Sequence, residues 1–435
     1  MPNTENVAAG MPRRRSRRRS VSTRLGVLAV AASLLLAAGC GGGSADPSTD
    51  DSTPSRDISA VLGPIAEAKG APVRIGMISD GKGPVSDLSV EFDMAKATVG
   101  YLNERRSGIA GRPIELVTCE ALADPAKGTD CANRMVEEDV VAVVVGSSSI
   151  VESIWRPLHD ARVPVMFHSA NGAPLRDSES TFAITDSAFS LINFPIQLAK
   201  EKGAGKVTAV TIDVPSATGI YRTAAPSAFD EAGIELSVVP IPPGTADMIP
   251  QMQNIASGDP GIVEVTGNDA FCIAAFNGLR AVGFTGTVTG VSQCITDRTR
   301  KAVPGDFLED MPVPATVPLG TDNPATQLIN AVATTYGKDV DTGRTAAMAM
   351  FTVFAAFQSA TGEISGEVSP ETIIAAIKGM PEKELPAAGG LRFRCNGKAD
   401  PDLPAVCVRG GLVTTLDEEG QPTEYEVIGS TPIED

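Results

Sequence analysis

Short apolar stretches that alternate with helical patterns constrain the fold of this chain most strongly. The stretches at 73–78, 140–145 and 206–213 read as strands, and the second has no polar residue, as in a sheet covered on both faces. Between the first two, apolar residues recur every three or four positions from Leu88 to Leu102, which is typical of a helix. Such alternation predicts an α/β fold with parallel sheets.

The length of the chain predicts two lobes, because one ordinary hydrophobic core does not organise so many residues. The final part changes character and predicts an antiparallel ending. Further strands are expected at 114–117, 164–167, 235–241, 261–266, 287–291, 390–394, 406–415 and 424–428.

The first 40 residues have the parts of a secretory signal: an arginine-rich head, a short apolar stretch and small residues before Cys40. A Cys at this junction resembles bacterial lipoprotein signals, in which the thiol is acylated. Ala37 stands where such signals usually have Leu, so an ordinary signal with a chance Cys is the alternative. We interpret residues 1–39 as a signal peptide and 40–70 as a flexible polar tether.

The mature chain is expected to be exported, strongly acidic and held at the outer face of the cytoplasmic membrane by its lipid alone. The formal net charge is −17, and removing residues 1–39, with seven Arg and one Glu, leaves −23. Such an acidic body argues against nucleic acid and against wide contact with anionic lipid. No segment after residue 40 is long and apolar enough to span a bilayer.

Six cysteines follow Cys40, and an even number in an exported protein indicates disulfides. Fifteen pairings are possible. A zinc site is the rival interpretation, but there is no Cys-x-x-Cys pair and the chain has two histidines, His159 and His168. No metal or cofactor is therefore expected. Sequence neighbours favour Cys119–Cys131, Cys272–Cys294 and Cys395–Cys407.

Polar loops end two strands that should lie side by side. The serine loop, residues 146–149, follows the 140–145 strand and opens a helix, whose free N–H groups and hydroxyls would bind a carboxylate. Simple N-capping is the alternative. Residues 168–172 follow the next strand and could hold an ammonium or amide, or form only an Asn-Gly turn around a polar strand end. The candidate ligand-binding residues here are Ser147, Ser148, Ser149, Ser169, Ala170 and Asn171.

In the second half, polar residues again end strands, and each could be a helix cap instead. They are Thr218 with nearby Ser216, Asn268, and Gln293 beside Ser292. There is no Gly-x-Ser-x-Gly elbow, phosphate-binding loop or dinucleotide fingerprint, so an enzyme is not expected.

Several of these segments, in this order, resemble the type I periplasmic solute-binding proteins, and most closely their leucine/isoleucine/valine-binding branch, the receptors of ABC importers. The segments are the 75–76 strand, Tyr101-Leu102-Asn103, residues 108–116, Asp124-Pro125, residues 145–149 and Pro164-Val165. The resemblance spans residues 72–432. It implies two Rossmann-like lobes with parallel sheets, joined by a three-strand hinge. Lobe one would hold 72–187 and 314–403, and lobe two 188–313 and 404–432.

The resemblance also implies ligand contacts. In the family, the serine loop and the end of the next strand hold the ligand's carboxylate and amino group. The second lobe usually adds an aromatic residue, whose place here falls at Thr218 or Ser216, and an acid, whose place falls at Ser292 or Gln293. Asn171 stands where the family often has Thr. Asp213 or Asp269 could supply the missing acid.

The chain is thus expected to be a solute-binding lipoprotein that captures an amino acid or amino-acid-like solute and delivers it to an ABC transporter permease. A ligand sensor or cell-envelope interaction protein on the same scaffold is the alternative. The sequence does not separate the two.

Overall fold

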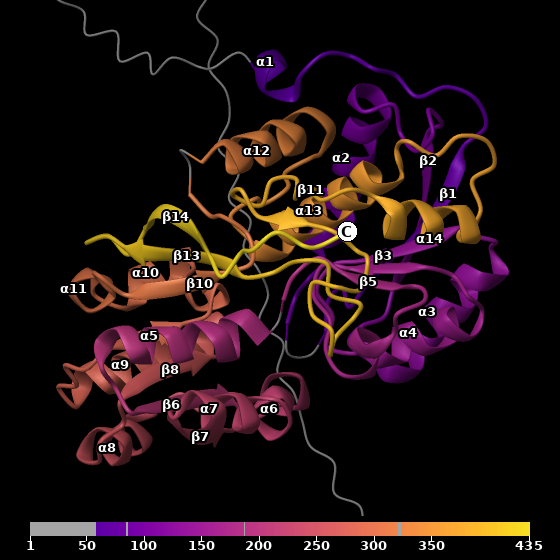
Figure 1. Ribbon diagram of the computed structural model, residues 1–435. Coiled ribbons are helices and arrows are strands. Elements are labelled where there is room, and N and C mark those ends of the chain that lie inside the picture. The colour runs from indigo at the N-terminus through magenta and orange to yellow at the C-terminus, as the bar shows by residue number, and fades with distance from the viewer. Residues whose placement is uncertain (1–57, 84–85, 187, 321–322) are drawn as a thin grey trace, which may run out of the picture. The chain divides into compact units, whose positions relative to one another are not determined.

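The computed structural model describes residues 58–435 except 84–85, 187 and 321–322. Cys40 and the predicted signal peptide lie outside the described residues. The first of two parallel sheets has five strands in the order β2-β1-β3-β4-β5 (Figure 1). Its strands are β1 (Val73–Ser79), β2 (Ile114–Glu120), β3 (Ala142–Val145), β4 (Val165–Phe167) and β5 (Thr181–Ala183).

Helices cover both faces of this sheet, which is why all four residues of β3 are buried apolar residues. One face packs in a hydrophobic core with α2 (Val90–Arg105), α12 (Pro324–Tyr336), α13 (Thr345–Thr361) and α14 (Pro370–Gly379). The other face packs with α3 (Pro125–Glu137) and α4 (Val151–Asp160). The side chains of α13 are buried almost all round, as suits a helix in the middle of a core.

The second parallel sheet has four strands in the order β7-β6-β8-β9. Its two faces have separate cores, one with α8 (Ile249–Ser257) and α9 (Asp269–Ala281) and one with α5 (Phe194–Lys202), α6 (Pro215–Arg222) and α7 (Ala225–Ala232). The prediction of an α/β fold with parallel sheets is confirmed. The strands are β6 (Lys206–Ile212), β7 (Glu235–Ile241), β8 (Ile262–Thr266) and β9 (Val288–Gly290).

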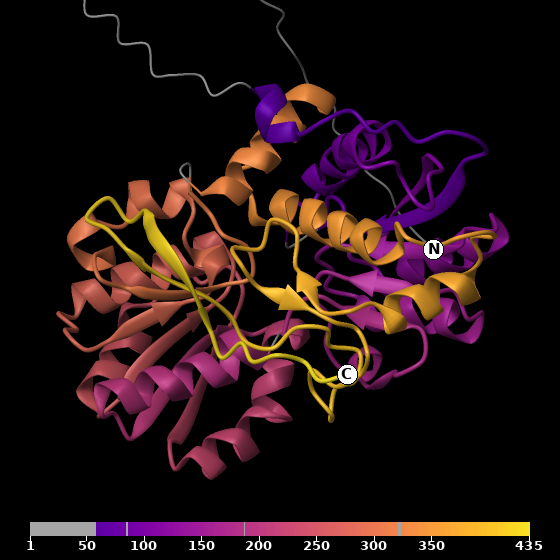
Figure 2. The same cartoon turned by 45° about the horizontal axis from the view of Figure 1, so that its top comes forward.

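The C-terminal part is antiparallel, as predicted. β10 (Pro312–Ala315), β13 (Gly411–Leu416) and β14 (Pro422–Ile428) form a three-stranded sheet, and β11 (Lys383–Glu384) pairs with β12 (Arg392–Phe393) (Figures 1 and 2). The remaining elements are α1 (Ile58–Leu62), α10 (Asp297–Ala302), α11 (Gly305–Leu308), the 3-10 helices η1 (Ala173–Arg176) and η3 (Ser292–Cys294), and the π-helix η2 (Phe189–Asn193). Among the described residues, no helix combines the length and apolarity needed to cross a bilayer.

Three segments carry the chain between the two parallel sheets and their helices, and they meet around one small cavity. The residues that line it are Thr185, Asp186, Phe189, Ser190, Ala315, Thr316, Leu391, Val408, Gly410 and Gly411. Just before the last segment, Val406 forms a parallel bridge to Ala183, and residues 405–408 pack in the cores of the first sheet.

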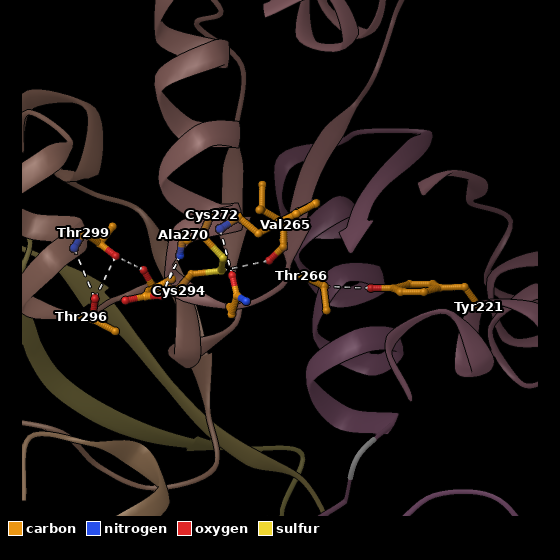
Figure 3. The surroundings of a disulfide bond; sticks show 11 residues. Tyr221, Val265, Thr266, Ala270, Cys272, Cys294, Thr296 and Thr299 are labelled. Atoms are coloured by element: carbon orange, nitrogen blue, oxygen red, sulfur yellow. Dashed lines mark hydrogen bonds between the residues drawn. A yellow bond between two sulfur atoms is a disulfide. The ribbon is translucent and has the colours of Figure 1, made fainter. Parts of the chain in front are cut away.

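Three disulfides join the six cysteines in the predicted pairs: Cys119–Cys131, Cys272–Cys294 and Cys395–Cys407. The second bond links α9 to η3, next to the end of β8, as Figure 3 shows. Each bond therefore fastens a helix or loop to a segment close by in the sequence.

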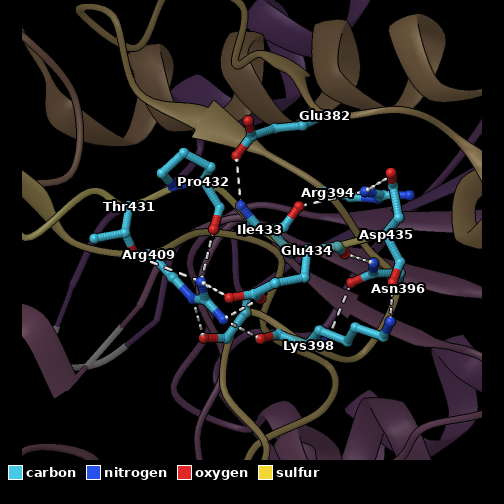
Figure 4. Close-up of polar contacts among 11 residues, drawn as sticks. Glu382, Arg394, Asn396, Lys398, Arg409, Thr431, Pro432, Ile433, Glu434 and Asp435 are labelled. Carbon is cyan, nitrogen blue, oxygen red and sulfur yellow. Dashed lines mark hydrogen bonds and ion pairs between the residues drawn. The ribbon is translucent and has the colours of Figure 1, made fainter.

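The C-terminal residues are bound by basic side chains near the third disulfide (Figure 4). Arg394 donates to the Asp435 carboxylate at 2.6 Å, and Arg409 donates to the Glu434 carboxylate at 2.9 Å and to the Pro432 carbonyl at 2.8 Å. These contacts fix the end of the chain against residues 394–409.

Candidate functional site

Three loops at the carboxyl ends of neighbouring strands form the candidate site in the first sheet. Asp80 follows β1, the serine loop follows β3, and residues 168–171 follow β4. β3 pairs with both β1 and β4, so the three loops adjoin one another. The strand order reverses between β1 and β3, which is where open α/β sheets bind their ligands.

The serine loop already holds a carboxylate, that of Asp80. The hydroxyl of Ser148 donates to Asp80 Oδ1 at 2.7 Å, and the amide and hydroxyl of Ser149 both donate to Oδ2 at 2.7 Å. Asp80 is fully buried, while Ser148 is half-buried and Ser149 is exposed. The loop has the anion-binding geometry expected of it, and a side chain of the same molecule occupies it.

A second acid, Glu91 on α2, lies beneath the same loop. The amide of Ser147 donates to its Oε1 at 2.8 Å, and the hydroxyl of Ser79 donates to its Oε2 at 2.6 Å. Burial raises the pKa of Glu91 to about 8, even though these two hydrogen bonds act to lower it. Glu91 is therefore mainly protonated at neutral pH.

The loop after β4 offers a mixed set of groups. His168 is buried, and its Nε2 has no hydrogen-bond partner among the described residues. Burial lowers the pKa of His168 to about 4, so the imidazole is neutral. Asn171 is exposed and Ser169 half-buried, whereas Ala170 is buried. Asn171 and Ser169 are thus the side chains of this loop that a ligand can reach.

The candidate residues of the second sheet follow β6, β8 and β9 and are largely engaged in local structure. Thr218 is buried on α6 and its hydroxyl donates to the Val214 carbonyl at 3.1 Å. Asn268 caps α9 by accepting from the amide of Phe271 at 3.0 Å. Gln293 is exposed in η3, and Ser292 is buried. Capping explains Asn268 without a ligand.

The acids considered for this half are paired with arginines. Asp213 lies 3.8 Å from Arg222, and Asp269 lies 2.9 Å from Arg298. A buried acid is found instead within β8: Glu264, whose two carboxylate oxygens have no hydrogen-bond partner among the described residues. Tyr221 lies near Glu264, but the Tyr221 hydroxyl forms its hydrogen bond with the Thr266 hydroxyl at 3.2 Å (Figure 3).

Sequence reasoning missed Asp80, Glu91 and Glu264 as parts of these sites. A signal existed for Glu91, because it is in helical step with the buried residues Ala95 and Leu102. Glu264 also interrupts the apolar residues Ile262, Val263 and Val265 of a buried strand. The signal for Asp80 was only its position at the end of the first strand, and its partners lie 68 and 69 residues away.

Solved structures that share this fold include solute-binding proteins of transporters. The branched-chain amino acid transporter substrate-binding protein LivJ from Streptococcus pneumoniae, in complex with isoleucine, has a TM-score of 0.64 at 17% identity, covering 82% of this chain and 99% of that chain. The leucine-binding protein LivK from Thermotoga maritima has the same TM-score and identity and covers 82% and 98%. A solute-binding protein from R. palustris in complex with 4-hydroxybenzoate has a TM-score of 0.64 at 20% identity and covers 83% and 98%.

These structures define the fold as that of the type I periplasmic binding proteins, as the sequence predicted. A family model described as periplasmic binding protein matches residues 72–411, and the chain belongs to this family. A search of curated proteins gives no match.

Proposed function

We propose that this protein is an extracytoplasmic receptor that captures a small amino-acid-like solute and delivers it to an ABC importer. The family match over residues 72–411 carries the proposal. The polar strand-end loops after β1, β3 and β4 support it, because they adjoin at the switch point of the first sheet. Catalysis on the solute is not part of the proposal.

The receptor would act by closing two lobes on its ligand. Lobe one would comprise residues 72–187 and 314–403, and lobe two 188–313 and 404–432. Because residues 405–408 pack in the cores of the first sheet, the second segment of lobe two would better begin after Val408. The ligand would contact Ser169 and Asn171 of lobe one and Gln293 of lobe two at the same time. Because only the closed form allows all three contacts, ligand binding would favour it over the open form. The crossover segments around the small cavity would be the hinge.

Acylation of Cys40 would keep the receptor at the outer face of the cytoplasmic membrane, near its permease. The polar residues 41–57 would form a tether that allows docking. The predicted tether to residue 70 is too long, because Leu62 packs in the core of the first sheet and the amides of Ala66 and Ala68 donate to the Glu104 and Asn103 carbonyls. Replacement of Cys40 by Ser should release the protein from the membrane fraction.

A thermal-shift screen against amino acids, their amides, small carboxylates, sugars and purines tests the function. A ligand that binds only the folded protein raises the melting temperature in a saturable way. Asn171→Ala should weaken binding of the ligand so identified by about tenfold or more, the value of one lost hydrogen bond to a ligand group. Asn254→Ala is a matched control, because Asn254 lies on α8, away from the strand-end loops. A folded protein that responds to no solute class contradicts the proposal.

A further inference from the structure

Four donors of the serine loop, two amides and two hydroxyls, are already committed within the protein. Both hydroxyl protons, of Ser148 and Ser149, and the Ser149 amide end on the two oxygens of Asp80. The amide of Ser147 donates to Glu91, and that of Ile150 donates to Ser148 Oγ at 3.1 Å. The amides of Ser147 and Ser149 and the hydroxyls of Ser148 and Ser149 thus already have acceptors inside the protein.

Because these protons are committed, the two hydroxyls can no longer donate to a ligand and can only accept from it. A serine hydroxyl has one proton, and once it has donated this proton its oxygen can only accept further hydrogen bonds. Ser149 is exposed and Ser148 half-buried, so these two residues are accessible to a ligand. The buried carboxylate of Asp80 lies 2.7 Å behind each of them. A ligand that reaches these two hydroxyl oxygens therefore meets acceptors with the Asp80 carboxylate behind them.

The backbone around Asp80 fixes this arrangement. The amide of Gly81 donates to Ser79 Oγ at 3.1 Å, and the same hydroxyl donates to Glu91. Gly81 has a φ of 59°, and a Cβ at this position would lie 2.2 Å from Glu120 Oε1. The turn that directs Asp80 toward the serine loop is therefore specific to glycine at 81.

We propose that Asp80 is a specificity-determining residue, and that the serine loop receives a hydrogen-bond donor of the solute, in the first place a primary ammonium, and excludes a carboxylate. The inference rests on the proposed solute-binding function and narrows its ligand class to amines and amides. An ammonium gains charge-assisted hydrogen bonds here, whereas a carboxylate meets repulsion from Asp80.

The decisive experiment opens the loop and offers it a simple anion. In Asp80→Ser the three donors lose their internal partner, so acetate, replacing chloride at constant ionic strength, should stabilise this variant saturably. Acetate should bind it about tenfold or more tightly than the unchanged protein. Glu137→Ala is the matched control, because it removes an exposed carboxylate on α3, away from the turn of Asp80, and should show no gain.

Asp80→Asn is a second variant in case the serine variant fails to fold, because it keeps the side-chain volume and removes the charge. It should show a smaller gain in acetate binding. The inference is overturned if acetate binds the unchanged protein as tightly as these variants, or if the folded variants gain no affinity for it. It is also overturned if the unchanged protein binds a carboxylate that Ser149→Ala abolishes, since Asp80 would then have moved aside.

A ligand series separates this inference from the proposed function. Isoleucine, isoleucinamide and the amine left by decarboxylation of isoleucine share one side chain and differ in the carboxylate. The unchanged protein should favour the amide and the amine over isoleucine, and Asp80→Ser should reverse that order. If no solute binds either protein, the proposed function fails, while the acetate titration still decides the role of Asp80.

Discussion

Gly146, at the junction of β3 and the serine loop, shows how a single residue without a side chain allows the site to form. A Cβ there would lie 2.4 Å from Glu91 Oε1 and 2.7 Å from Met350 Cε, closer than real Cβ contacts. Met350 Cε ends a flexible side chain and can shift, but Glu91 Oε1 accepts from the Ser147 amide and is buried, so the collision falls on a hydrogen-bonded group in a packed core.

Gly146→Ala should therefore lower the free energy of unfolding by about 1–3 kcal/mol, as overpacking of a core does. Gly219→Ala is the matched control, because Gly219 is helical in α6 and a Cβ there would meet nothing within 4 Å. The control should be neutral or raise stability by up to about 1 kcal/mol. Urea unfolding of both variants checks this, and equal losses would refute the packing argument.

At the scale of elements, α13 contains two threonines that are buried to the same extent and differ in their hydrogen bonds. Thr352 Oγ1 has no partner among the described residues, whereas Thr361 Oγ1 donates to the Phe357 carbonyl at 2.7 Å. A buried hydroxyl without a partner costs free energy, and valine has nearly the same shape without that hydroxyl.

Thr352→Val should raise the free energy of unfolding by about 1 kcal/mol, and Thr361→Val should leave it unchanged or lower it by a similar amount. Chemical denaturation of the two variants measures the contrast within one helix. The same loss of stability in both would mean that Thr352 has a partner in solution.

The strands were the elements best predicted from the sequence, because a run of apolar residues is typical of a strand inside a covered sheet. The expected strand at 235–241 has the bounds of β7, and the one at 73–78 falls one residue short of β1. The stripe predicted from Leu88 to Leu102 is less accurate, since Leu88 is only half-buried and the acid Glu91 lies inside. A prediction from apolar periodicity expects only apolar residues on the buried face of a helix. It therefore misses a buried polar residue, such as Glu91, whose hydrogen bonds allow it to be there.

The candidate site could be predicted only in part, for a related reason. Parallel pairing brings the serine loop beside residues 168–171, and the order of the strands was enough to expect this. That Asp80 fills the serine loop depends on a contact across 68 residues, which no local pattern records. The capping role of Asn268, in contrast, was one of the two interpretations that its position allowed.

At the scale of the whole molecule, buried acids set the dependence of stability on pH. Burial raises the pKa of Glu91 near the first sheet and of Glu264 in the second to about 8, and that of Asp186 in a crossover segment to about 6. Each folded-state value lies above the ordinary one. The stability that these groups contribute is thus complete below about pH 4.5 and is lost as the pH rises toward 8.

Other carboxyl groups act in the opposite direction. Burial would raise the pKa of Asp177, but hydrogen bonds, first from Thr181, lower it below its ordinary value, and the Ser89 hydroxyl lowers that of Asp87. Their contribution is present above about pH 4 and is lost in acid. His168, with its pKa lowered to about 4, likewise contributes stability that is lost as the pH falls below its ordinary value of 6.5. The raised acids outnumber it, so stability is expected to be greatest below neutrality.

The melting temperature should therefore fall between pH 6 and 8, with Glu91 and Glu264 each costing at most about 1.4 kcal/mol per pH unit. Glu264→Gln should remove about half of this fall and leave the melting temperature at pH 5 nearly unchanged, because the acid is already protonated there. Glu235→Gln, at an exposed position on β7 of the same sheet, should keep the full fall. Calorimetry across this range tests the argument, and a melting temperature that stays level to pH 8, or falls equally in Glu264→Gln, would show that water or a cation reaches the carboxylate of Glu264.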